Sequence, residues 1–473
     1  MPLHRTILAL TLAAALPAAA GAVEERRSTL ADQQSVAVTI YNEDLALIKD
    51  TRRITLDAGR NVLALREVSA QMRPETAQLR SLSHPGAFTL LEQNFDFDLL
   101  TPAKLLEKYV GRAVRIVRTH PTTGAETIET AQVLSANEGV VLRIGDRIET
   151  GIPGRIVYDD VPATLRDRPT LVTHLESRRA GEQTVELSYL TGGLAWQADY
   201  VAELNAADTA LALSGWVTLT NRSGTAYPDA RLQLVAGDVH RVREDMRYAV
   251  TRAAPVPEAA RADAVRQEAL FEYHLYTLAR PTTLADNQTK QVALLDAGSV
   301  PVTKELVLEG HDYYYRAAAR DRGQKHKVAV YVQFENREAA GLGMPLPKGI
   351  VRVYKKDRAG NAQFVGEDRI DHTPKNERVR LRLGDAFDVT ARKKQTDFRK
   401  NGERAFESAY EIVLNNAKRE AVTVIVREPV PGDWRMLEQS HPHAKAAAGI
   451  AEWRVTVPAE GTTTLRYRVL VQL

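Results

Sequence analysis

Apolar and polar residues alternate at every second position through most of the chain, which is the period of a β-strand with one buried face. The segment "YLTGGLAWQADYVAEL" (189–204) shows this pattern most clearly. Its expected buried face consists of Trp196, Ala198, Tyr200, Ala202 and Leu204. We therefore expect Trp196 in a core and Asp199 on the outward face. Gly192 and Gly193 suit a bend before the strand, and because a strand rather than a helix follows them, we expect no phosphate-binding loop here.

One segment departs from this pattern. In "TPAKLLEKYVG", Thr101 can cap a helix, Pro102 suits the first helical position and Gly111 suits the end. Short β-type runs and tight turns follow, including "PTTG", "SANEG" and "IGD". We predict a short helix and a small SH3-like or Sm-like barrel, inserted at 101–160.

The spacing of the remaining strands predicts an all-β chain of sandwich type rather than an α/β fold, because no long amphipathic helix alternates with the strands. A stretch rich in alanine, proline and charged residues predicts a mobile loop near 252–266. The expected segments are a signal peptide at 1–22, the first strands of a sandwich at 23–100, the helix and small barrel at 101–160, the continuation of the sandwich at 161–324, and a C-terminal sandwich at 325–473.

The N-terminus has the three parts of a secretory signal peptide. Arg5 supplies a positive charge, Ile7–Leu16 is apolar, and Ala20-Gly21-Ala22 is a small-residue cleavage site. We expect cleavage between Ala22 and Val23, export to the periplasm or the medium, and no transmembrane span in the remaining chain. The absence of cysteine excludes a lipid-modified cysteine, a thiol nucleophile and a cysteine metal site.

The overall charge argues against a nucleic-acid partner. The chain has 63 Lys and Arg against 60 Asp and Glu, a net charge of +3, and loss of Arg5 with the signal peptide leaves +2. A nearly balanced surface is not the basic footprint that nucleic-acid binding requires. We therefore expect no RNA partner, even though Sm-like barrels can bind RNA.

Several motifs resemble an exported bacterial family known as domain of unknown function 4139. They are "YNEDLALIKDTRRITLDAGRNVLAL", "YLTGGLAWQADY", "VTLTNRSGTAYPDARLQLVAGD", "FEYHLYTL" and "PLPKGIVRVYKKDRAGNAQFVGE". The resemblance covers most of the mature chain and implies export and immunoglobulin-like β-sandwich domains. Some relatives carry the label mucoidy inhibitor, which hints at the cell envelope or exopolysaccharide. The family supplies no known catalytic residue.

Two sets of residues are candidates for ligand binding. In "HDYYYR", Tyr313 and Tyr315 would point to one side of a strand and Tyr314 to the other, so at least one aromatic face could be open to a ligand. In "GDAFD", which we predict to be a strand–turn–strand, Asp385 and Asp388 are paired carboxylates that could serve in acid–base chemistry or bind calcium. Cross-strand packing of the tyrosines and turn capping by Asp385 remain the simpler alternatives.

These observations favour a non-enzymatic exported protein that binds envelope protein or glycan through loops and edge strands, or that acts as a scaffold. The alternative is a periplasmic polysaccharide hydrolase that uses carboxylates between Asp371 and Asp388. We expect no cofactor and no metal, because His441 and His443 lie in a loop-like segment around Pro442 without a third ligand. The ligand and the oligomeric state stay open.

Overall fold

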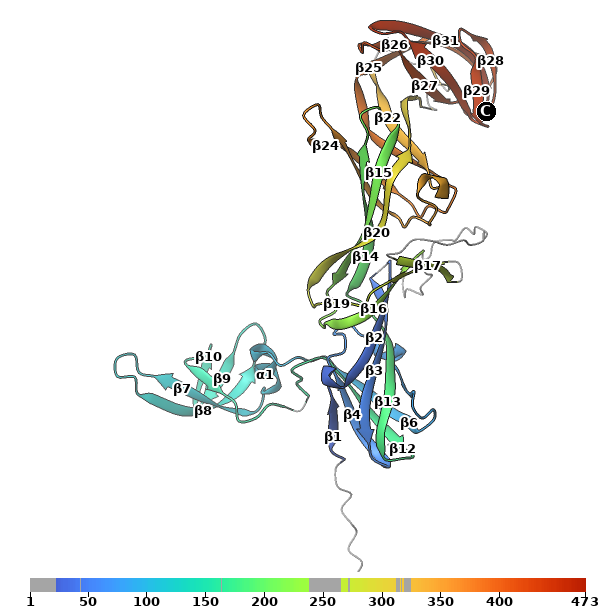
Figure 1. The fold of residues 1–473 in the computed structure, drawn as a ribbon. Coiled ribbons are helices and arrows are strands. Elements are labelled where there is room, and N and C mark those ends of the chain that lie inside the picture. Colours follow the sequence, from blue (N-terminus) through green and yellow to red (C-terminus); the bar gives the residue numbers. More distant parts are fainter. Residues whose placement is uncertain are drawn as a thin grey trace, which may run out of the picture. The chain divides into compact units, whose positions relative to one another are not determined.

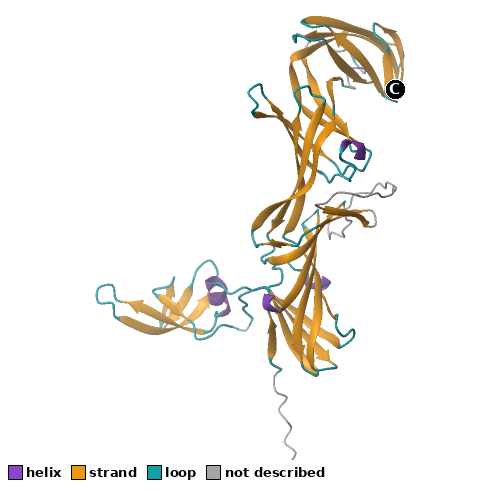
Figure 2. Cartoon of the chain, in the orientation of Figure 1, coloured by secondary structure: helices purple, strands orange, loops and turns teal. Residues whose placement is uncertain are grey.

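The computed structural model shows a chain built almost entirely of β-strands (Figure 1; Figure 2). It describes residues 23–42, 44–162, 164–237, 265–270, 273–311, 315, 317–318 and 325–473. Among these, the one α-helix is α1 (Pro102–Lys108), and short 3₁₀ turns occur at η1 (Leu30–Asp32), η2 (Pro74–Thr76) and η4 (Glu338–Ala340). The prediction of an all-β chain is confirmed. The expected signal peptide at 1–22 and most of the expected loop at 252–266 lie outside the described residues.

The chain divides into two compact units. One comprises the described residues up to Val36 together with Ile48–Leu190, and the other comprises Ala37–Leu47 together with Thr191–Leu473. Strands β2 (Gln33–Tyr41) and β3 (Leu45–Leu56) contribute residues to both units.

In the first unit, a four-stranded sheet has the order β1-β4-β12-β6, and β3, β13 and β5 are neighbours in a second sheet. These strands are β1 (Glu25–Ser28), β4 (Gly59–Arg66), β5 (Gln78–Ser81), β6 (Phe88–Asp96), β12 (Thr170–Ser177) and β13 (Gly181–Thr191). The buried guanidinium of Arg52 pairs with Asp50 and donates to the backbone oxygens of Ser28 (3.0 Å) and Arg66 (2.8 Å). One buried cation thereby holds the ends of the parallel strands β1 and β4.

The segment around α1 forms a small sheet with its own core. Its order is β10-β9-β8-β7-β11, from β7 (Ala113–Thr119), β8 (Glu126–Ser135), β9 (Val141–Ile144), β10 (Arg147–Thr150) and β11 (Arg155–Val157). Thr101 caps α1, because its hydroxyl accepts from the backbone N–H of Lys104 at 3.2 Å. Leu106 and Tyr109 pack with buried Ile116 and Leu142. The predicted helix and its start are confirmed.

In the second unit, a five-stranded sheet has the order β20-β15-β14-β23-β24. Its strands are β14 (Leu194–Leu204), β15 (Ala210–Asn221), β20 (Gln288–Pro301), β23 (Gly349–Lys356) and β24 (Ala362–Ile370). A further run of neighbours is β17-β18-β16-β2, with β19 also paired to β16; these are β16 (Tyr227–Ala236), β17 (Val265–Leu270), β18 (Tyr273–Leu278) and β19 (Thr282–Leu284).

A nine-stranded sheet completes the second unit, in the order β28-β31-β26-β25-β22-β21-β27-β30-β29. Its strands are β21 (Thr303–Glu309), β22 (Lys325–Glu335), β25 (Arg378–Lys400), β26 (Ala405–Asn416), β27 (Val422–Pro429), β28 (Asp433–Gln439), β29 (His443–Ala447), β30 (Ile450–Val457) and β31 (Gly461–Gln472). Lys393 on β25 and Glu428 on β27 are in contact although two strands separate β25 from β27 in the sheet order. The sheet therefore folds back on itself.

The predicted turn in "GDAFD" is wrong. Strand β25 runs through this segment without ending, but its pairing with β22 shifts here. Lys327 of β22 lies opposite Thr390, and Ala329, two residues further along β22, lies opposite Asp385. Two residues of β22 therefore match five residues of β25. The extra residues form a bulge. Bulges re-aim side chains within a continuous strand, which is why a turn-like composition need not end one.

The alternation predicted for 189–204 is confirmed. Trp196 is 5% exposed, and the other four residues of that face are also buried. Gly193 has a φ of +78°, which favours glycine, and its N–H donates to Asp44 at 2.8 Å. The bend at the start of β14 thus turns Trp196 into the core.

We expect Trp196→Ala to lower the free energy of unfolding by about 3–5 kcal/mol, because the substitution removes a large buried ring and leaves a cavity. Urea denaturation of the purified chain measures this, with Trp196→Phe as the conservative control. An alanine variant as stable as the parent would contradict the core position of Trp196.

Candidate functional site

The outer face of the five-stranded sheet carries an exposed tryptophan. The register of β14 and β15 places Asp199 opposite Trp216, and on the next strand Trp216 lies opposite Ala293. Trp216 is 40% exposed, whereas its chain neighbours Gly215 and Val217 are buried on the inner face. Ala293, which lies opposite Trp216, is also exposed.

A continuous row of polar contacts crosses all five strands beside this ring. Its members are Gln291 on β20, Thr218 on β15, Asp199 on β14, Arg352 on β23 and Glu367 on β24. The Gln291 amide donates to the Thr218 hydroxyl (3.1 Å), which donates to Asp199 Oδ2 (2.7 Å). Arg352 Nη1 donates to Asp199 Oδ1 (2.9 Å), and its Nε lies 3.4 Å from Glu367 Oε2. Each strand contributes one side chain.

Asp199 is the centre of this row. It is buried although it points to the outer face, and it also accepts from the Gln197 amide at 3.2 Å. Burial is the largest single influence on its pKa and raises it, but the hydrogen bonds from Thr218, Arg352 and Gln197 together hold the pKa below its ordinary value. Asp199 is therefore an ionised, fully bonded acceptor that fixes its neighbours, and it is not poised as a base.

Of the three tyrosines of the "HDYYYR" motif, the structure describes only Tyr315. Tyr313 and Tyr314 lie outside the described residues. Tyr315 is fully buried; its hydroxyl donates to Glu428 Oε2 (3.0 Å) and lies 2.8 Å from the hydroxyl of Tyr467. Burial, with the nearby charge of Glu428, raises the pKa of Tyr315. Lys393 Nζ lies 2.7 Å from the same carboxylate oxygen, so Tyr315 belongs to a buried ionic cluster.

The carboxylates of "GDAFD" lie on the bulge of β25. Asp385 pairs with Arg382 (2.8 Å) and with Lys327 (3.1 Å). Asp388 is exposed, and between the two acids Phe387 is 95% exposed. Upstream, Asp368 accepts from the backbone N–H of Arg382 at 2.6 Å. The ion pairs and the backbone bond give Asp385 and Asp368 structural partners.

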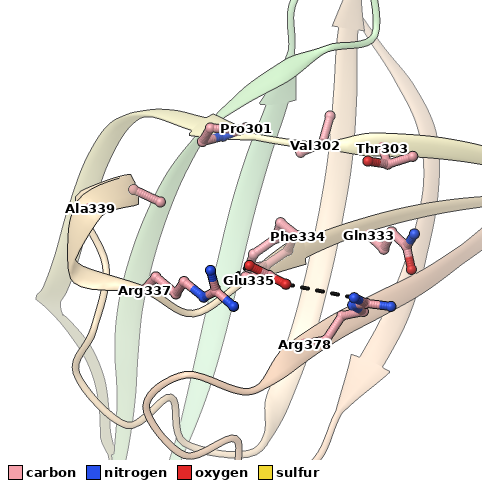
Figure 3. A pocket seen from close by; sticks show the side chains of 10 residues that line it. Pro301, Val302, Thr303, Gln333, Phe334, Glu335, Arg337, Ala339 and Arg378 are labelled. Atoms are coloured by element: carbon pink, nitrogen blue, oxygen red, sulfur yellow. Dashed lines mark ion pairs between the residues drawn. The ribbon is translucent and has the colours of Figure 1, made fainter.

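An open hollow of about 340 Å³ lies where β20, β21, β22 and β25 begin or end (Figure 3). Figure 3 shows Glu335 between Arg337 and Arg378, with Pro301, Val302 and Thr303 on the opposite side. Glu335 Oε2 lies 2.9 Å from Arg337 Nε, and its Oε1 lies 3.6 Å from Arg378 Nη2.

The described part of the chain contains no cluster of three or more His, Asp or Glu side chains arranged to hold a metal ion. Nor does any helix described there have the length and apolar content needed to cross a membrane.

The chain matches a known protein family over its C-terminal part. Residues 185–473 match a family model described as "Domain of unknown function (DUF4139)". No curated protein matches the chain. The matched residues include the whole outer face with Trp216, the hollow and the nine-stranded sheet, whereas the small sheet around α1 lies outside them.

We expect Asp199→Asn to lower the free energy of unfolding by about 1–3 kcal/mol at pH 7, the typical value of hydrogen bonds to a charged group. Because folding lowers the pKa of Asp199, this contribution is present above the pKa of the unfolded chain, near 4, and is lost as pH falls through the folded pKa. Urea denaturation from pH 7 to pH 3 should show the two proteins converging at low pH. A difference that grows as pH falls would count against the ionised row.

We expect Lys393→Met to destabilise the chain by about 3–5 kcal/mol, because it leaves the carboxylate of Glu428 buried without its cation. The double variant Lys393→Met/Glu428→Leu should recover most of the loss, since it removes both charges. Thermal unfolding of the parent and the three variants, including Glu428→Leu alone, measures the coupling. Additive effects of the two substitutions would show that the pair is not coupled.

Proposed function

We propose that the chain is a non-enzymatic exported protein that binds an envelope component through the outer face of its five-stranded sheet. The chain belongs to the DUF4139 family, because the matched residues make up more than half of it. Of the two expected classes of partner, protein and glycan, the composition of this face favours a glycan.

The observation that carries the proposal is the exposed Trp216 beside the five-strand polar row. An indole in water keeps a large apolar surface unburied, and such rings are typical of recognition surfaces. A sugar ring offers an apolar C–H face and hydroxyl groups at its edge. Trp216 can stack against the C–H face of the sugar, and the exposed amides of Gln197 and Gln291 can form hydrogen bonds with its hydroxyl groups.

The charge of the face agrees with an uncharged ligand. Arg352 is shared by the carboxylates of Asp199 and Glu367, so the row carries no excess of positive charge that would favour an acidic ligand, and Glu203 pairs with Lys356 at 2.6 Å on the same sheet. The row is thus held in place by its own contacts and presents donors and acceptors in a fixed arrangement. Preorganisation of this kind lowers the entropic cost of binding.

The finer architecture is part of the proposal. The nine-stranded sheet folds back through the contact of Lys393 with Glu428, which supports an immunoglobulin-like sandwich for the C-terminal part. The five short strands next to α1 support an SH3-like or Sm-like fold for 101–160. The signal-peptide pattern at 1–22 supports export to the periplasm or the medium.

The hydrolase alternative receives no supporting observation. A glycosidase needs one carboxyl group as acid and a second as base or nucleophile across the substrate. Asp385 is instead paired with Lys327 and Arg382, and Asp368 is bonded to the backbone of β25.

We expect the mature chain to bind selected uncharged glycans on an array of bacterial envelope saccharides, and Trp216→Ala to weaken that binding at least about tenfold, the loss typical of a central aromatic contact. Phe387→Ala is the control, because it removes an exposed ring that lies on β25 rather than on this face. Thermal unfolding should show that both variants are folded. Equal binding by the parent and Trp216→Ala, or no binding to any glycan, would refute the proposal.

A further inference from the structure

The hollow of Figure 3 has an excess of positive charge. Two guanidinium groups, those of Arg337 and Arg378, share the single carboxylate of Glu335. Of the charged groups around it, Glu338 pairs with Lys375 (2.9 Å) and Arg380 lies 3.4 Å from Glu305, whereas Glu377, next to Arg378 in the chain, does not line the hollow. The residues that line the hollow therefore carry two positive charges and one negative charge.

Most of the donors on these two arginines are unused by the protein. Arg337 engages Glu335 through Nε, and Arg378 reaches it only at 3.6 Å, beyond a normal hydrogen bond. A guanidinium has five N–H groups in a planar fork that matches a carboxylate. Among the described residues, no other side chain accepts from these two guanidiniums.

The other residues that line the hollow indicate what the rest of the ligand is like. Pro301, Val302 and Ala339 provide apolar groups. Thr303 lies beside Val302, and Gln333, whose amide donates to Glu305 (3.0 Å), provides a further polar group. The hollow, at about 340 Å³, is at the lower end of the range for small-molecule sites. It has room for one compact group with an apolar face, several hydroxyls and one negative charge.

We infer that the hollow binds the carboxylate of an acidic sugar, such as a uronic acid residue in a polysaccharide. The carboxylate bonds to Arg378 and Arg337, and the sugar ring lies against Pro301 and Val302. This site differs from the Trp216 face in its residues and in the charge of its ligand, so the inference does not depend on the proposed function.

The test is calorimetric titration of the mature chain with sodium D-glucuronate, with D-glucose as the uncharged match. We expect glucuronate to bind more tightly than glucose. Arg378→Gln and Arg337→Gln should each weaken glucuronate binding about tenfold, the effect of losing a charge-assisted hydrogen bond. Arg358→Gln, an exposed arginine in the β23–β24 hairpin, is the matched control and should bind as the parent does.

The same titration has results that would overturn the inference. These are no binding of glucuronate, equal binding of glucose, or equal weakening by Arg358→Gln, which would indicate unspecific charge attraction. Equal or tighter binding of inorganic phosphate would show an anion site without a preference for carboxylate. Tighter binding of N-acetylaspartate would show a site for acidic peptides instead of sugars. If Trp216→Ala lost glucuronate binding and the two arginine variants kept it, the ligand would bind at the Trp216 face and not in the hollow.

Discussion

The pairing of β14 with an antiparallel strand on one side and a parallel strand on the other is the constraint on which the five-stranded sheet depends. Side chains alternate between the faces of a strand, so this register decides at once what fills the core and what the outer face displays. Trp196 and Tyr200 point into the core, and Asp199, at an odd-numbered position of the same strand, points to the opposite face. A slip of one residue would turn Asp199 into the core, away from its partners, and would expose the rings of Trp196 and Tyr200. Fold and candidate site are therefore consequences of the same pairing.

Charged pairs serve different purposes in different parts of the chain. The ion pairs of Arg52 with Asp50 and of Lys393 with Glu428 are buried. Arg52 joins β1 to β4 through its bonds to the backbone, and Lys393 with Glu428 joins β25 to β27. Buried pairs of this kind add little net stability but penalise arrangements that separate them. The row through Asp199 and Arg352 lies at the surface instead. Its contacts hold polar side chains in fixed positions next to Trp216, which is what a binding surface requires.

The sequence predicts local features well and contacts between distant strands poorly. The strand at 194–204, the core position of Trp196 and the start of α1 follow from period, capping and glycine chemistry, which are local. Arg352 is 153 residues from Asp199, and nothing in either segment indicates the other. A signal for Trp216 did exist, because it shares the phase of Ser214 and Thr218, which is the polar face of β15. The sequence could not show that Tyr315 is buried, because its hydroxyl is bonded to Glu428, a residue 113 positions away.

The central claim is that the outer face around Trp216 and Asp199 contacts an envelope component in the cell. Site-specific photo-crosslinking tests it most directly, because it captures a bound molecule whatever its chemical identity. A photoreactive phenylalanine analogue is placed at position 197, exposed on this face, and in a second strain at position 387, exposed on the bulge of β25. The account predicts a light-dependent adduct to an envelope component from position 197 and none from position 387. Adducts from position 387 alone, or equal adducts from both, would contradict it.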